Sequence, residues 1–117
     1  LFTVNRTIIR EDGLEYQRDI IEHNGSAVIA AVFPDQTVAL VRQYRHAAKK
    51  YLLELPAGSL EAGETPQECA EREVIEETGF RAGVIEKLTE FYVSPGFLSE
   101  KMFVFLATEL TEVGQNL

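Results

Sequence analysis

Apolar and polar residues alternate along the first part of the chain, and this alternation predicts β-strands. Residues 1–10 are rich in β-branched and aromatic side chains, and Asp12-Gly13 is a typical two-residue hairpin turn. Residues 14–21 then alternate in the same way and form the return strand. The sequence therefore predicts an antiparallel hairpin at the N-terminus.

Further strands are predicted beyond this hairpin, separated by turn residues rich in glycine and proline. They cover residues 26–33, 37–44, 51–56, 83–93 and 101–108. Residues 26–33 are almost wholly apolar, as expected for a strand covered on both faces. The pattern lacks internal repeats and heptads, so solenoid and coiled-coil folds are excluded.

One segment has the periodicity and the end signals of a helix. Thr65 and Glu68 form a capping box, and Pro66 stands at the first helical position. Gly79 is a left-handed stop. We therefore predict a helix over about 66–78, the only well-marked helix in the sequence.

Three carboxylates share one face of this predicted helix. Glu73, Glu76 and Glu77 stand at i, i+3 and i+4, close enough to repel one another. A solvated acidic face is the ordinary explanation. Small apolar residues lie on or beside the same arc, however: Cys69, Ala70 and Val74. Carboxylates at the rim of a core repel one another at high cost unless they bind a cation or take up protons, and a divalent metal is the simplest answer.

Composition indicates a single domain over residues 1–117. The chain is 45% hydrophobic and 26% charged, which fits one compact unit with a modest core. A single cysteine excludes an internal disulfide, and no apolar run is long enough for a membrane helix or a signal peptide. These features favour a soluble protein of the cytoplasm, with no membrane partner. The start at Leu1 and the polar end are those expected of a piece of a longer product.

The net charge of −8 is concentrated in one segment. Between Glu54 and Glu77 there are eight acids and one base, Arg72, which leaves −1 for the remainder of the chain. An acidic chain lacks the basic surface of a general nucleic-acid binder, so no nucleic-acid partner is expected. A phosphate-bearing ligand would need a metal ion to approach this segment.

Several polar residues outside the helix have two interpretations each. Arg18 shares a strand face with apolar residues, where arginine ordinarily reaches to the edge or pairs with a carboxylate, and a ligand contact is the alternative. Arg42 and Arg45 end a predicted buried strand, where they form an anion clamp or neutralise the acidic segment. His23 and His46 lack a paired ligand spacing and are predicted to be surface histidines.

Nine residues match the fixed positions of the Nudix box, Gly-x5-Glu-x7-Arg-Glu-apolar-x-Glu-Glu-x-Gly-apolar. They are Gly58, Glu64, Arg72, Glu73, Val74, Glu76, Glu77, Gly79 and Phe80. The flanking stretches VRQYRH (41–46), LELPAG (53–58) and SPGF (94–97) resemble the ADP-ribose pyrophosphatase branch of that family. The resemblance covers most of residues 14–108.

The resemblance implies an α/β fold, an α/β/α sandwich in which the box forms a loop, helix and loop against a mixed sheet. The implied reaction is hydrolysis of the diphosphate of ADP-ribose to AMP and ribose 5-phosphate, with two or more Mg²⁺ ions, or Mn²⁺ in their place. Another nucleoside diphosphate sugar, such as GDP-mannose, is an alternative substrate. A non-hydrolytic ADP-ribose sensor is a second alternative, although the intact glutamates argue against it.

The resemblance also implies roles for individual residues. The expected metal ligands are Glu73, Glu76, Glu77 and the backbone carbonyl of Ala57. Arg72 would hold a carboxylate in position, Glu64 would support the site, and Gly58 would let the backbone approach closely.

Three residues would contact substrate by the same resemblance. Arg45 would contact phosphate, and Glu100, after the SPGF loop, would face substrate, although it is equally a common surface residue. Arg18 would reach the nucleoside bound to a neighbouring subunit, since relatives form homodimers by exchanging N-terminal strands, here about 1–22. Relatives continue into an acidic loop, a strand and a helix that are not recognisable after Glu112, so the general base is unassigned.

Overall fold

The computed structural model describes residues 3–115, which form eight strands and one helix. In chain order the elements are β1 (Thr3–Glu11), β2 (Leu14–Glu22), β3 (Ser26–Ala31), β4 (Val41–Arg45), β5 (Lys50–Glu54), β6 (Ala57–Ser59), α1 (Pro66–Thr78), β7 (Phe80–Tyr92) and β8 (Lys101–Glu112).

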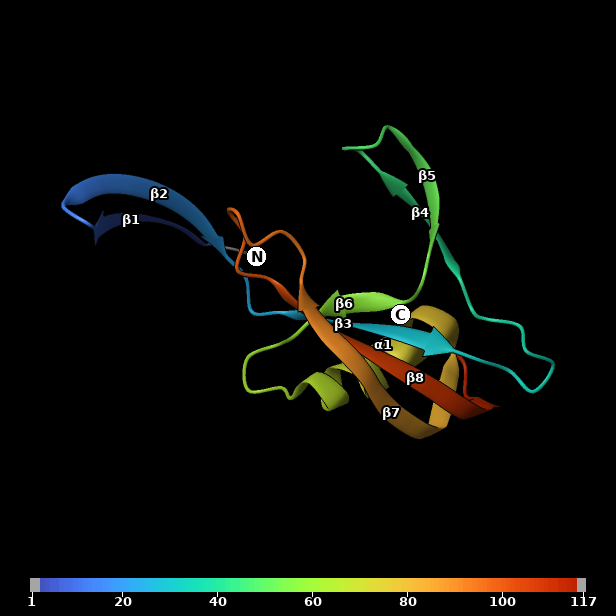
Figure 1. The fold of residues 1–117 in the computed structure, drawn as a ribbon. Helices are drawn as coiled ribbons and strands as arrows, with labels where there is room; N and C mark the ends of the chain where they lie inside the picture. Colours follow the sequence, from blue (N-terminus) through green and yellow to red (C-terminus); the bar gives the residue numbers. More distant parts are fainter. Residues whose placement is uncertain (1–2, 116–117) are drawn as a thin grey trace.

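A four-stranded mixed sheet forms the body of the molecule. The strand order is β6-β3-β8-β7, with β3 and β8 parallel and the other neighbours antiparallel. Helix α1 packs against this sheet (Figure 1). The core lies between them and consists of Ala27, Ile29, Ala31, Cys69, Ala70, Val74, Phe105 and Ala107. Burial of these apolar side chains is what holds the helix on the sheet.

Helix α1 begins and ends where the sequence predicts. The Thr65 hydroxyl accepts a hydrogen bond from the Glu68 amide at 3.1 Å, and the Glu68 carboxylate accepts one from the Thr65 amide at 2.9 Å. Pro66 occupies the first turn, and Gly79 ends the helix with φ of 78°. Glycine adopts this left-handed conformation without steric cost.

The last turn of α1 contains no basic residue, and the end of the described chain caps it instead. The Gln115 side-chain amide donates to the carbonyl of Glu77 at 2.9 Å and to that of Glu76 at 3.3 Å. The backbone carbonyl of Gly79 accepts from the amides of Val113 and Gly114 at 2.8 and 3.0 Å. The terminal carbonyls of the helix are thereby satisfied by residues that follow β8.

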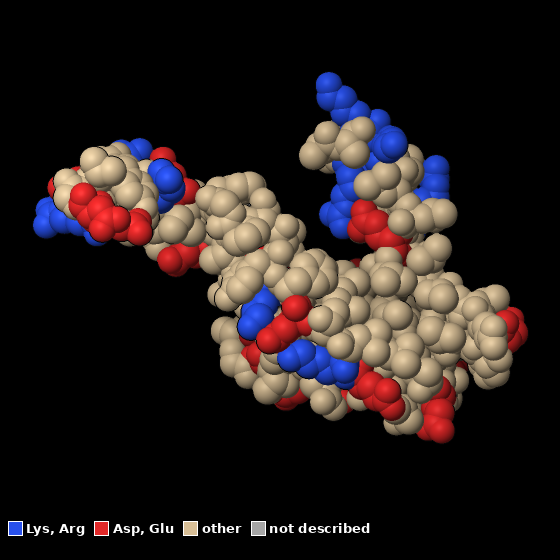
Figure 2. Space-filling view, in the orientation of Figure 1, with Lys and Arg blue, Asp and Glu red and all other residues tan. Residues whose placement is uncertain are grey.

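Two antiparallel hairpins, β1–β2 and β4–β5, project from the body (Figure 1). The radius of gyration is therefore 17.3 Å, against about 13 Å expected for a compact chain of this length. Lysine and arginine gather on the β4–β5 hairpin (Figure 2). The hairpins also leave large apolar side chains exposed, among them Val4, Ile8, Leu14, Tyr44, Tyr51 and Leu53.

The prediction of a buried strand over 37–44 is wrong. Only Val41–Arg45 forms β4, and four of its five residues are exposed because the hairpin leaves the body. Residues 37–40 fold back on the end of β3 instead, where the Ala39 amide donates to the Ala31 carbonyl at 3.0 Å. The three-residue strand β6 was not predicted, since its short sequence, AGS, has no strand periodicity.

The prediction that 26–33 is covered on both faces is wrong for the described residues. Ala27, Ile29 and Ala31 are fully buried beneath α1, whereas Val28 and Ala30 on the other face are only partly buried. The cause is that α1 covers one face of the sheet, and the second helical layer of the expected sandwich is not among residues 3–115.

The predicted fold class is confirmed as a mixed α and β fold with an N-terminal hairpin, a mixed sheet and one helix. Among the described residues, no helix combines the length and the apolar composition needed to cross a membrane.

Candidate active site

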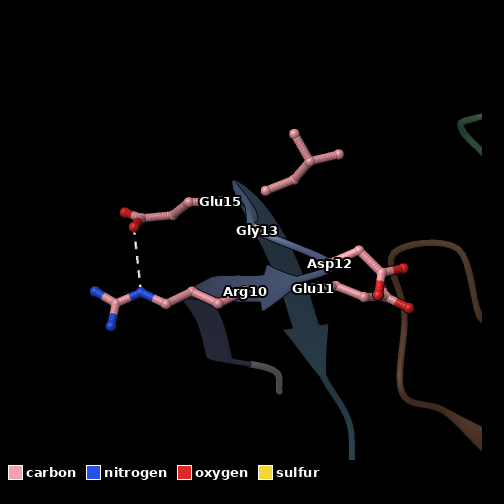
Figure 3. A pocket seen from close by; sticks show the side chains of 6 residues that line it. Arg10, Glu11, Asp12, Gly13 and Glu15 are labelled. Atoms are coloured by element: carbon pink, nitrogen blue, oxygen red, sulfur yellow. Dashed lines mark hydrogen bonds and ion pairs between the residues drawn. The ribbon is translucent and has the colours of Figure 1, made fainter.

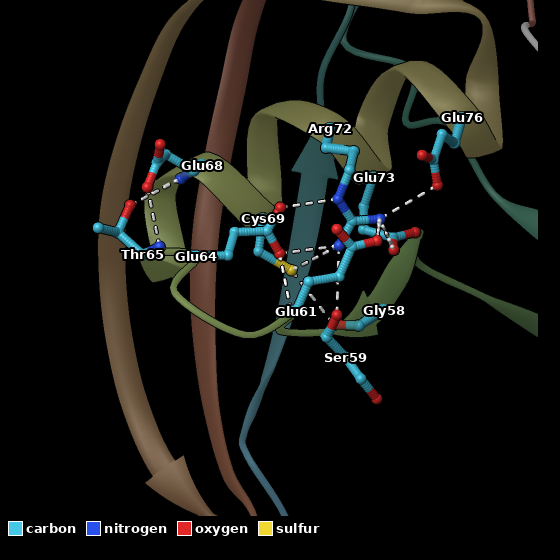
Figure 4. Close-up of polar contacts among 10 residues, drawn as sticks. All are labelled: Gly58, Ser59, Glu61, Glu64, Thr65, Glu68, Cys69, Arg72, Glu73 and Glu76. Carbon is cyan, nitrogen blue, oxygen red and sulfur yellow. Dashed lines mark hydrogen bonds and ion pairs between the residues drawn. The ribbon is translucent and has the colours of Figure 1, made fainter. Parts of the chain in front are cut away.

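Arg72, on the face of α1 that meets β6, organises the acidic residues of the box (Figure 4). Its guanidinium donates to both oxygens of Glu64, from Nε at 2.7 Å and from Nη2 at 2.9 Å. Nη1 donates to Glu73 at 2.7 Å and to Glu76 at 3.2 Å, and Nη2 also reaches the carbonyl of Ser59 at 3.2 Å. One arginine therefore fixes carboxylates from both the loop and the helix.

These hydrogen bonds change the proton affinities of the partners. Hydrogen bonding to Arg72 lowers the pKa of Glu64 to about 2, and the same contact raises the pKa of Arg72. Both groups are therefore charged at neutral pH, and the bidentate pair holds the loop before α1 against the helix.

Glu73 is the buried carboxylate of the group, with only 8% of its surface exposed. Its pKa is raised because burial disfavours the charged form, and repulsion from Glu76 and Glu77 adds to this effect while Arg72 opposes it. A Cβ atom at Gly58 would overlap the Glu73 carboxylate. Glycine at this position is therefore what lets β6 lie against the carboxylate.

The three glutamates that the resemblance assigns to metal binding lie on one face of α1 but do not converge. Arg72 bonds Glu73 and Glu76, while Glu77 borders a separate cavity. Among residues 3–115, no group of three His, Cys, Asp or Glu side chains is arranged so that it could hold a metal ion. The donor chemistry still fits Mg²⁺ or Mn²⁺, because the proposed ligands are all carboxylate or carbonyl oxygens.

A cavity of about 410 Å³ joins this helix to β3, β4, β6 and β8. Its walls are Ser26, Gln43, Arg45, Ala57, Gly58, Ser59, Glu77, Glu100 and Met102. Five residues singled out from the sequence therefore meet here, although they are spread over more than fifty positions: Arg45, Ala57, Gly58, Glu77 and Glu100.

The two arginines expected to contact substrate lie in different places. Arg45 borders the cavity, but its guanidinium forms a two-bond pair with Glu54 at 2.6 and 2.8 Å, which raises the pKa of Arg45. Arg18 lies on the projecting β1–β2 hairpin, stacked over the ring of Tyr16 at 4.5 Å and donating to the carbonyl of Gln17. A single chain therefore does not bring Arg18 into the cavity.

Two residues at the site were missed or misread in the sequence. Ser26, the first residue of β3, is 5% exposed and donates its hydroxyl to Glu100. The prediction of a surface position for His23 is wrong, because its side chain is only 16% exposed and both ring nitrogens are hydrogen-bonded. A polar residue opening an apolar strand was the one signal available for Ser26.

A second hollow, at the tip of the β1–β2 hairpin, has no such convergence (Figure 3). It measures about 230 Å³ and is lined by residues 10–15 alone, with Arg10 and Glu15 paired at 3.2 Å. None of the predicted site residues borders it, so it is a consequence of the turn geometry.

Known proteins resemble the chain over nearly its whole length. A family model described as NUDIX domain matches residues 23–116. The ADP-ribose pyrophosphatase of Bacillus subtilis (strain 168) is 42% identical over 100 residues, which cover 86% of this chain and 54% of the relative. A GDP-mannose pyrophosphatase of Escherichia coli O1:K1 / APEC is 34% identical over 116 residues, which cover 92% of this chain and 60% of the relative.

A solved structure agrees with these sequence relatives. It is described as a crystal structure of an ADP compounds hydrolase and superposes with a TM-score of 0.82 at 27% identity, covering 100% of this chain and 63% of that one. The chain thus spans between half and two thirds of the length of the proteins that it resembles.

Proposed function

Because the chain belongs to the Nudix domain family, we propose that it hydrolyses the diphosphate of a nucleoside diphosphate sugar, with Mg²⁺ or Mn²⁺ as cofactor. ADP-ribose, cleaved to AMP and ribose 5-phosphate, is the first choice of substrate. The 42% identical relative is an ADP-ribose pyrophosphatase, and the structural neighbour is an ADP compounds hydrolase.

The observation that carries the proposal is the composition of the 410 Å³ cavity. It is lined by a box glutamate, Glu77, and by Ala57 and Gly58, together with Arg45 and Glu100. Carboxylates suited to a divalent cation and a guanidinium suited to phosphate thus border one space. A diphosphate linked to a sugar is the ligand class that needs both.

The residues of the chain have separable tasks in this reaction. Glu73, Glu76 and Glu77, with the carbonyl of Ala57, would hold the metal. Bound ions offset the negative charge of the diphosphate and activate the attacking water. Water then adds across one P–O bond of the diphosphate, so that each product leaves with one phosphate group.

Arg72 would act on the ligands rather than on the substrate. Its bidentate bond to Glu64 anchors the guanidinium, and its remaining donors reach Glu73 and Glu76. Metal binding would require these two carboxylates to share their oxygens with the ion. Because Arg72 keeps two hydrogen bonds to Glu64, it can release Glu73 or Glu76 to the metal without losing its own position.

Arg45 would exchange its partner when substrate binds. It is about half exposed, and a phosphate offers the guanidinium the same two-bond geometry as a carboxylate, so a phosphate could take the place of Glu54. The two parallel bonds to Glu54 show that the guanidinium already presents the fork that binds phosphate.

A homodimer with exchanged N-terminal strands would complete the site. The β1–β2 hairpin projects from the body with Val4, Ile8 and Leu14 exposed, and it carries Arg18. A second chain against this hairpin would bury the apolar side chains and bring Arg18 to its neighbour's nucleoside.

Steady-state hydrolysis by the full-length protein tests the proposal. We expect Mg²⁺-dependent release of AMP from ADP-ribose, abolished by EDTA and restored by Mn²⁺. If kcat/KM for GDP-mannose is tenfold or more above that for ADP-ribose, GDP-mannose is the substrate and ADP-ribose is not. Binding of ADP-ribose without release of AMP over hours would instead establish a sensor.

The sensor alternative has one observation in its favour. Within residues 3–115 no three acidic side chains are arranged so that they could hold a metal ion, and Arg72 engages two of the three proposed ligands. Titration with Mn²⁺, followed by its paramagnetic signal, separates this case, because a sensor that uses no metal would leave the signal of free Mn²⁺ unchanged.

A further inference from the structure

The connection between β2 and β3 is fastened to the loop that precedes Glu100. The Ile21 amide donates to the Phe97 carbonyl at 2.7 Å, and the Ser99 amide donates back to the Ile21 carbonyl at 2.8 Å. The His23 amide then donates to the Ser99 hydroxyl at 2.9 Å. Two segments more than seventy residues apart in sequence therefore act as one unit beside the cavity.

The His23 ring extends this unit to β6. The backbone amide of Gly25 donates to Nδ1 at 2.9 Å, and Nε2 lies 3.2 Å from the hydroxyl of Ser59. Since Nδ1 accepts a hydrogen bond from Gly25, Nε2 is the ring nitrogen that faces Ser59. Ser59 borders the cavity beside Gly58, so His23 spans from the loop connection to the cavity wall.

Ser26 holds the Glu100 carboxylate itself. Its hydroxyl, almost completely buried, donates to Oε2 of Glu100, and the same oxygen lies 4.0 Å from Nδ1 of His23. The side chain of Glu100 is only 17% exposed and borders the cavity. Among the hydrogen bonds of the described residues, only Oε2 is engaged, which leaves Oε1 for a ligand.

We propose that Ser26 and His23 are positioning residues, which fix the Glu100 carboxylate in the cavity wall so that it accepts a hydrogen bond from the sugar or base of the substrate. This inference rests on the proposed function. A carboxylate accepts hydrogen bonds and repels phosphate, so a fixed Glu100 selects for a hydroxyl or amino group outside the diphosphate. Fixing matters because an unheld carboxylate would turn away from a negatively charged ligand.

The positions of the two residues suit this task. Ser26 is the first residue of β3, where pairing with both β6 and β8 makes the backbone rigid. His23 does not border the cavity that Glu100 lines, so it would act only through its neighbours. Neither residue needs to change protonation.

A double-mutant cycle in the full-length enzyme tests the proposal. Ser26→Ala and His23→Ala are each made in the wild-type chain and in a Glu100→Ala chain, and hydrolysis of ADP-ribose is measured. We expect Ser26→Ala to raise KM about tenfold in the wild-type background, with kcat little changed, because the hydrogen bond between Glu100 and substrate is weakened in ground and transition states alike. His23→Ala should raise KM by a smaller factor, because the His23 ring reaches Glu100 only through its neighbours and the backbone bond to Ser99 is kept. In the Glu100→Ala background neither should raise KM further.

Two results of this cycle would overturn the proposal. An equal rise in KM in both backgrounds would show that Ser26 and His23 act independently of Glu100, and an unchanged KM in the wild-type background would also overturn the proposal. Thermal unfolding identifies a variant that has simply lost its fold, in which case the other variant decides.

The failure of the proposed function would be recognised separately. If the wild-type enzyme hydrolyses no nucleoside diphosphate sugar, that function is refuted. Crystal structures of the wild-type and Ser26→Ala proteins then decide the positioning: a Glu100 carboxylate turned away from the cavity in the variant supports it, and an unchanged one overturns it.

Discussion

Replacing Gly58 by alanine should displace the carboxylate of Glu73 from its present position, while the charge of the protein stays the same. The added Cβ would overlap that carboxylate, which is buried and bonded to Arg72 at 2.7 Å. The side chain can rotate to avoid the clash, so the steric cost is small. The rotation sacrifices the charge-assisted hydrogen bond, which contributes about 1.5–3 kcal/mol.

Alanine also restricts the unfolded chain, which stabilises by about 0.4–1 kcal/mol where the backbone permits it. The net expectation for Gly58→Ala is a loss of about 1–2 kcal/mol in the free energy of unfolding. Gly96→Ala is the matched control, because a Cβ there meets nothing within 4 Å and the φ of Gly96 is not in the left-handed region. The control should equal the wild type or exceed it slightly.

Urea denaturation measures the stability, and Mn²⁺ titration measures the site. Because Glu73 is a proposed ligand, Gly58→Ala should also weaken Mn²⁺ binding by about tenfold or more, which is the usual effect of disturbing a group that orients a metal ligand. A Gly58→Ala protein as stable as Gly96→Ala and with wild-type affinity for Mn²⁺ would show that the close approach of β6 to Glu73 does not hold the carboxylate in place.

Three further predictions address the other charged residues. Glu77→Gln should lower kcat/KM at least ~100-fold with an intact fold, whereas Glu71→Gln on the same helix should keep the wild-type rate, and equal rates would refute the metal assignment. Glu64 has a pKa lowered from 4.5 to about 2, so its contribution to stability is present above pH 4.5 and lost as the pH falls toward 2. Urea denaturation at pH 7 and at pH 3 measures the free energies of unfolding of the wild type and Glu64→Gln. The difference between the two proteins should be smaller at pH 3 than at pH 7, and an equal difference at both pH values would contradict this. Arg45→Ala should raise KM about tenfold, while Arg42→Ala, stacked on a tyrosine outside the cavity, should leave it unchanged, and a similar rise in both would point to a general charge effect.

Local signals in the sequence were sufficient for the helix and for the first hairpin. The capping box at Thr65 and the glycine stop at Gly79 define both ends of α1, and Asp12-Gly13 defines the turn between β1 and β2. These features act within four or five residues, so they can be read without knowledge of the tertiary structure.

Burial and long-range contacts were not accessible in the same way. The segment before Arg45 has the apolar content of a core strand, yet β4 projects from the body, where only tertiary contacts decide burial. The burial of His23 could not be predicted locally, because two of its three hydrogen-bond partners, Ser59 and Ser99, are 36 and 76 residues away. The role of Ser26 likewise depends on Glu100, 74 residues further along the chain.

The residues assigned to metal and substrate remain predictions about function, but their placement is informative. The Nudix box supplied Arg72 and Glu64, which the structure joins in a bidentate pair. It did not indicate that Arg45 would be paired with Glu54. The register of β4 against β5 sets Arg45 opposite Lys50 and Glu54 opposite Val41, so the strand pairing alone does not reveal this contact between the two side chains.

The cap that Gln115 places on α1 has a consequence for the order in which the molecule forms. The helix is complete in sequence at Thr78, but the carbonyls of Glu76 and Glu77 gain their side-chain partner 39 and 38 residues later. During synthesis the chain folds from its N-terminus, so the last turn of α1 stays open to fraying until β8 has paired and delivered Gln115. The backbone of the turn that carries Glu76 and Glu77 therefore gains these two hydrogen bonds only once β8 has paired, so the cavity wall at Glu77 depends on a segment far along the chain.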